Sequence, residues 1–70
     1  METYLEKLLS QIRCKKARPY IAEEIRDHIE CQIADNLSEG MSYEEAEKNA
    51  VTDMGDPVEV GISLDRIHKP

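Results

Sequence analysis

The sequence predicts an all-α fold, a compact bundle of four helices in a single domain spanning residues 1–70. Apolar residues recur three and four positions apart, which is the spacing of one helix face. Helix-forming residues dominate the composition, and Trp and Phe are absent. Two short segments, near residues 40 and 55, each join a glycine to a helix-start signature. Together these observations predict helices at about 2–12, 18–39, 43–54 and 57–67.

The first helix is predicted over residues 2–12. Polar side chains take one side of it, and the other side carries Tyr4, Leu5, Leu8, Leu9 and Ile12. The segment RCKKARP then breaks the pattern. Pro19 fits the first turn of a second helix, because its missing N–H would be unsatisfied there in any case.

The second helix is predicted to be the long central one, over residues 18–39. Its apolar residues recur every four positions, at Ile21, Ile25, Ile29, Ile33 and Leu37. A helix turns every 3.6 residues, so a repeat of four rotates by about 40° at each step. This helix must therefore contact different partners at its two ends. Gly40 supplies the left-handed position that ends it.

The remaining two helices begin with capping signatures. SYEE predicts a capping box, in which the side chain of Ser42 accepts from the first turn and Glu45 bonds back to the N–H of Ser42. The predicted inward side of this third helix carries Tyr43, Ala46, Ala50, Val51 and Met54. Gly55 ends it, and Asp56, Pro57 and Glu59 repeat the same start signature for the fourth helix. The predicted capping residues are Gly40, Ser42, Glu45, Gly55, Asp56 and Glu59.

The acids of DMGDPVEV could instead form a metal or catalytic loop. Paired carboxylates act in that way only when burial or a further ligand brings them together. Asp56 and Glu59 already have capping roles, and the spacing does not match a calcium loop. Capping is the favoured interpretation, and we predict no catalytic residue.

No metal or cofactor site is predicted from the other candidate residues. His28 and Cys31 lie three apart on one helix, and Cys14 or His68 could join them, but a zinc site usually needs a second close-spaced pair. A partly buried Cys31 and a surface or interface His28 are the favoured interpretation. A chain of 70 residues also has little core in which to form a substrate cavity, so we predict a protein that is not an enzyme.

Charge is distributed unevenly along the chain. Residues 1–20 carry a net +3 and residues 21–70 a net −9. The basic segment holds Arg13, Lys15, Lys16 and Arg18, and it could contact nucleic acid or anionic lipid. It could equally pair with the acids of the second helix or be solvated. A helix-turn-helix is disfavoured, because acids cover the would-be recognition helix and would repel phosphates.

The fourth helix has more apolar circumference than a surface helix needs. Val58 and Ile62 lie on one side, and Val60, Leu64 and Ile67 lie on another. We predict that Val60, Leu64 and Ile67 belong to an interaction surface, together with the basic segment and the exposed part of the second-helix stripe.

The run EGMSYEEAEKNAV followed by MGDPVEVG resembles the HAAS-type domain, also called the permease prefix domain. Residues 39–57 carry the match, and AEEIRDHIE and LDRIHKP also fit. The specificity lies in the two joints at this separation, since each is a common capping signature by itself.

The resemblance implies a small helical adaptor, cytoplasmic and at the inner face of the membrane, at the N-terminus of a bacterial membrane protein. Such domains are regarded as signalling or interaction modules without catalytic residues. The implied partners are a PadR-like regulator or the protein's own membrane region, and a homodimer is a further option. The resemblance also implies that a transmembrane region follows Pro70 in the native chain. The 70 residues themselves depart from the family pattern in this respect, because none of their segments is apolar enough to span a bilayer.

Overall fold

The computed structural model describes residues 1–69, and within that range it has four helices and no strand. The helices are α1 (Glu2–Leu9), α2 (Arg18–Ser38), α3 (Tyr43–Met54) and α4 (Pro57–Ile67). The all-α prediction is confirmed. The bounds agree with the predicted ones to within one residue, except at the end of α1. Pro70 lies outside the described residues.

α1 ends three residues before its predicted end at residue 12. The N–H groups of Gln11 and Ile12 donate to carbonyl oxygens three residues back, at 3.1 and 3.0 Å, which is the tighter bonding of a 3₁₀ turn. Ile12 is nevertheless fully buried. The apolar spacing thus identified Ile12 correctly as a core residue, although its backbone is no longer α-helical.

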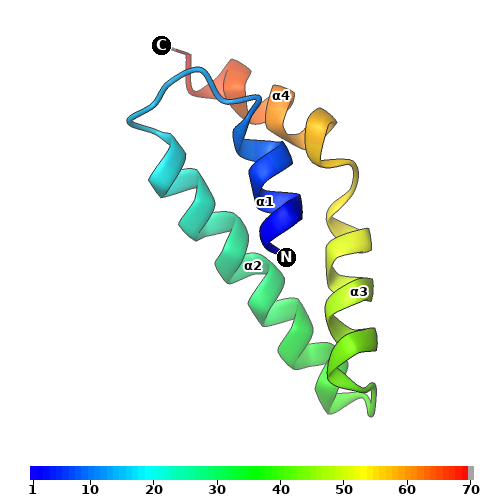
Figure 1. Ribbon diagram of the computed structural model, residues 1–70. Coiled ribbons are helices and arrows are strands. Elements are labelled where there is room, and N and C mark those ends of the chain that lie inside the picture. Colours follow the sequence, from blue (N-terminus) through cyan, green and yellow to red (C-terminus); the bar gives the residue numbers. More distant parts are fainter. Residues whose placement is uncertain (70) are drawn as a thin grey trace.

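The four helices form an elongated bundle with extents of 42 × 18 × 17 Å. α2 packs against both α3 and α1, and α1 packs against α4. Figure 1 shows α2 and α3 as an antiparallel hairpin, with α1 beside the first half of α2. α4 lies across the C-terminal end of α1. We call residues 1–17 and 57–69 the closed end, and residues 30–47, around the α2–α3 turn, the hairpin end.

The core runs through the middle of the bundle and draws on α1, α2 and α3. Its buried members are Tyr4, Leu8, Ile12, Ile21, Ile29, Ile33, Ala46 and Ala50. The second-helix stripe rotates as predicted. Its members Ile21, Ile29 and Ile33 are buried, whereas Leu37, its last residue, is 40 % exposed.

Candidate functional site

The turn at the hairpin end is closed by backbone bonds around Gly40. Gly40 has φ +97°, a conformation that only glycine adopts readily. Its N–H donates to the carbonyl of Leu37 at 3.0 Å, and the N–H of Met41 donates to the carbonyl of Asn36 at 3.3 Å. This pair of bonds is the Schellman motif, which satisfies the last carbonyls of α2.

Side-chain caps begin the two helices after the glycines. Ser42 Oγ accepts from the N–H of Glu45 at 3.2 Å, and Asp56 Oδ1 accepts from the N–H of Val58 at 3.1 Å. Among the described residues neither Glu45 nor Glu59 makes the predicted return bond. Each capping box is therefore half formed. The reason is exposure, because both glutamates are open to water, which solvates a carboxylate as well as a backbone N–H does.

Gly55 joins these two helices in a conformation that is even more restricted. Its φ of +93° and ψ of −176° lie in a region occupied essentially by glycine alone. The backbone changes direction here within one residue, so that Asp56 can cap α4 directly after α3 ends. The residues of DMGDPVEV thus serve the joint.

The acids, cysteines and histidines of the described residues do not gather into a metal site, since no three such side chains come together there. His28 is exposed. Cys31 is also exposed, so its predicted partial burial is wrong; Cys14 is half-buried, and both thiols are free. Cys31 lies on the side of α2 away from the core residues Ile29 and Ile33, and this explains its exposure.

The basic segment is partly consumed by contacts within the chain. The backbone N–H of Arg13 donates to Asp65 Oδ1 and its Nε donates to Oδ2, both at 2.8 Å. Arg18 Nε donates to the carbonyl of Ile12 at 2.7 Å. Of these four basic residues, Lys15 and Lys16 are exposed and form no ion pair among residues 1–69, whereas the exposed Arg13 side chain is paired with Asp65 and Arg18 is half-buried. The predicted four-residue basic surface therefore keeps two unpaired lysines.

Asp65 ties α4 to the loop after α1, and its sequence context gave no sign of this role. The carboxylate is almost buried, and the hydrogen bond from the Arg13 backbone, supported by the Arg13 guanidinium, lowers the pKa of Asp65. Because the partner lies 52 residues away in sequence, no local pattern could have identified the pair.

α4 approaches α1 most closely at Gly61. A Cβ atom placed there would lie 2.5 Å from the carbonyl oxygen of Leu8 and 2.8 Å from Cβ of Gln11. Sequence reasoning missed this residue. A glycine inside a helix costs about 1 kcal/mol relative to alanine, and that cost is itself a sign of close packing.

Because the Gly61 face of α4 packs against α1, it also determines which apolar side chains of α4 are exposed. Val60 and Leu64 are half-buried and pack against the core, so only part of each side chain is left for the predicted interaction surface. Ile67 is 74 % exposed. Val58 and Ile62, which were not part of the predicted interaction surface, are each about 40 % exposed. The sequence showed two apolar sides, but only the contact with α1 determines which one is covered.

Two buried polar side chains lie inside the bundle. Asn36 donates from Nδ2 to the carbonyl of Ala46 at 3.0 Å and accepts from Gln32 at 3.1 Å, which links α2 to α3. The Tyr4 hydroxyl has no hydrogen-bond partner within residues 1–69. Burial, together with the nearby charge of Asp56, raises the pKa of Tyr4.

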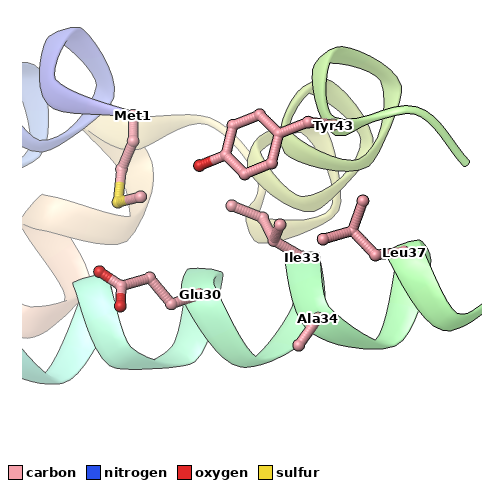
Figure 2. A pocket seen from close by; sticks show the side chains of 6 residues that line it. All are labelled: Met1, Glu30, Ile33, Ala34, Leu37 and Tyr43. Carbon is pink, nitrogen blue, oxygen red and sulfur yellow. The ribbon is translucent and has the colours of Figure 1, made fainter.

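An apolar groove lies at the hairpin end, where α2 and α3 extend past the start of α1. It has a volume of about 410 Å³ and is lined by Met1, Glu30, Ile33, Ala34, Leu37 and Tyr43. Figure 2 shows Met1 and the Tyr43 ring facing each other, with Ile33 below the ring on the side of α2. The prediction that Tyr43 points inward is wrong. It is 58 % exposed, because α1 begins at Glu2 and does not extend along α3 as far as Tyr43.

None of the helices within residues 1–69 combines the length and the apolar character that crossing a bilayer requires. Comparison of the chain with protein-family models, with curated proteins and with solved structures found no match.

Proposed function

We propose that this chain is a non-catalytic protein-interaction module. The observation that carries the proposal is the groove at the hairpin end, where Leu37 and Tyr43 are large, exposed and side by side with buried core residues. Exposed tyrosine next to aliphatic side chains is typical of the central residues of protein interfaces.

The resemblance to HAAS-type domains supports a more specific form of this proposal. In that form the chain is the N-terminal cytoplasmic domain of a bacterial membrane protein, at the inner face of the membrane. It transmits a signal through contacts with a PadR-like regulator, with its own membrane region or with a second copy. The run from Glu39 to Pro57 supports it, since the two glycine joints and the side-chain caps lie at the separation of the signature.

Site-specific photocrosslinking in cells of the source organism tests the proposal. Tyr43 and Tyr20 are exposed to nearly the same extent, 58 % and 60 %, so each can be replaced with p-benzoylphenylalanine as a matched pair. We expect a protein adduct of discrete mass from position 43 and none from position 20. Equal adducts at both positions, or no adduct at position 43, would overturn the proposal.

A second candidate function uses the basic segment to bind nucleic acid or anionic lipid. The exposure of Lys15 and Lys16 at the closed end favours it, but two lysines add only about 1 kcal/mol each near an anionic membrane. Binding of this kind would depend steeply on salt and would be lost in the variant Lys15→Gln/Lys16→Gln. It ranks below the groove because Arg13 and Arg18 are held in internal hydrogen bonds.

A further inference from the structure

We infer that the groove at the hairpin end binds an amphipathic helix that carries lysine or arginine beside its apolar face. This inference rests on the proposed function and adds the chemistry of the partner. It follows from the length of the groove, from its apolar lining and from the charges around it.

The shape of the groove comes from unequal helix lengths. At about 1.5 Å per residue, the 21 residues of α2 span about 31 Å and the 8 residues of α1 only about 12 Å. α1 therefore lies along the first part of α2 and stops at Met1, which lines one end of the groove (Figure 2). Glu2 pairs with Arg26, and Met1 lines the groove with Glu30, so the part of α2 beyond α1 covers about its last eight residues. At about 1.5 Å per residue this is about 12 Å, enough for about two turns of a partner helix.

The lining of the groove suits the apolar side of a helix. Ile33 forms its buried floor, and Leu37 and Tyr43 stand exposed beside it. A helix that docks between two others places residues i, i+3, i+4 and i+7 against them. Because both walls of the groove are helices whose backbone bonds are already made, no free strand edge is present there for an extended peptide.

The charge around the groove selects a basic partner. Residues 30–47 carry six carboxylates and neither lysine nor arginine. Five of the six are exposed and form no salt bridge among the described residues. The sixth, Glu47, has its carboxylate 3.9 Å from the N-terminal amino group. Glu30 itself lines the groove. Lysine or arginine beside the apolar face of a partner would meet these unpaired carboxylates.

The same charge disfavours a second copy of this chain as the occupant. Two hairpin ends placed face to face would bring twelve carboxylates together, opposed at most by the N-terminal amino group and Lys48 of each copy. Like charges across an interface cost several kcal/mol, so such a dimer would lose much of what burying Leu37 and Tyr43 provides.

Three synthetic helical peptides of 18 residues provide the test, each labelled with a fluorophore and titrated with the 70-residue chain. The first is amphipathic and contains leucine, alanine and lysine. The second has glutamate in place of each lysine, and the third has the composition of the first in a scrambled, non-amphipathic order. We expect binding of the first peptide alone at physiological ionic strength. Equal binding of the glutamate peptide or of the scrambled peptide would overturn the inference.

Matched variants locate the binding. Leu37 and Ile62 are isomeric side chains that are equally exposed, at 40 % each. We expect Leu37→Ser to weaken binding about tenfold, as for the loss of a central interface residue, and Ile62→Ser to leave it unchanged. Glu30→Gln should weaken binding about threefold, while Glu23→Gln, two turns earlier on an exposed part of α2, should not. Equal effects within either pair would place the binding elsewhere.

Two further outcomes separate this inference from the proposed function. A protein adduct at position 43, together with no binding of the lysine peptide, would keep the interaction module and reject the basic helix as its partner. A dimer that forms with rising concentration and is abolished by Leu37→Ser would instead identify a second copy as the occupant. Sedimentation velocity on the folded variants measures this directly.

Discussion

The closed end and the hairpin end of the bundle are held together in different ways. At the closed end, α1 and α4 are joined by contacts between residues about 50 positions apart, namely the close approach at Gly61 and the pair Arg13–Asp65. At the hairpin end, α2 and α3 are joined by residues within about ten positions, through the Gly40 turn and the Asn36–Ala46 bond.

The two ends therefore leave different side chains open to a partner. The closed end depends on long-range contacts, which cover Val60 and Leu64 and pair Arg13 with Asp65, and its exposed apolar residues lie on the outer side of α4. The hairpin end forms locally and leaves Leu37 and Tyr43 uncovered without disturbing the core. Substitutions at the closed end, at the two glycine joints and in the core show how much each of them contributes to stability.

Gly61→Val should break the closed end. The new side chain would begin with a Cβ only 2.5 Å from the Leu8 carbonyl oxygen, so α4 must move away from α1. We expect a loss of about 3 kcal/mol in the free energy of unfolding, measured by urea denaturation. Ser63→Val on the exposed side of α4 is the control and should change stability by less than about 0.5 kcal/mol. A similar small change at Gly61 would show that the close approach does not matter for stability.

Gly55→Ala should cost more than Gly40→Ala, although both glycines end helices. Gly55 combines a positive φ with an extended ψ, whereas Gly40 lies in a Schellman turn that other residues can adopt with some strain. We expect losses of about 2 kcal/mol and about 1 kcal/mol respectively. Thermal unfolding of the two variants measures the difference. Equal losses would mean that the joint before α4 is no more restricted than the hairpin turn.

Asp56→Ala should cost about 1 kcal/mol, because α4 loses its N-cap. Ser42→Ala at the start of α3 should cost a similar amount, since the two caps make equivalent bonds at the two joints. Glu59→Ala should change stability little, because no return bond is present to lose. A larger loss for Glu59→Ala than for Asp56→Ala would contradict this account of the joint.

Tyr4→Phe should stabilise the protein by up to about 1 kcal/mol at neutral pH. The substitution removes a buried hydroxyl that has no partner among residues 1–69 and leaves the ring in the core. The raised pKa of Tyr4 adds a pH dependence: the folded state holds the proton more tightly, so stability falls as pH rises above about 10. Tyr4→Phe should reduce this alkaline loss. A destabilised variant would show that the hydroxyl has a partner after all.

Asp65→Asn should have its clearest effect on the acid side. The pKa of Asp65 is lowered in the folded state, so the contribution of its carboxylate is present above the unfolded pKa and is lost as pH falls below about 4. We expect the melting temperature of the wild type to fall in that range and that of Asp65→Asn to fall less. Glu59→Gln, an exposed acid on the same helix, is the control. Identical acid profiles for all three proteins would exclude Asp65 as a source of the pH dependence.

The helices and their joints follow from local features of the sequence. Apolar spacing, the two glycines and the caps at Ser42 and Asp56 act within four residues of their own positions, so each can be recognised from the residues around it. The rotation of the apolar stripe along α2 can also be predicted from the sequence, because it follows from the helical repeat alone. For this reason three of the four predicted helices have bounds correct to within one residue.

Which side chains remain available to a partner depends on how distant helices pack together. Val60 and Leu64 are covered because Gly61 allows α4 to lie close against α1, and Arg13 is held by a carboxylate 52 residues away. Tyr43 is exposed because α1 is too short to reach it. Each outcome depends on a contact between two helices that are distant in sequence, and the residue pattern of one helix does not show how strongly it binds the other. Local patterns therefore predict where the helices lie, whereas the packing of α1 determines which side chains stay exposed.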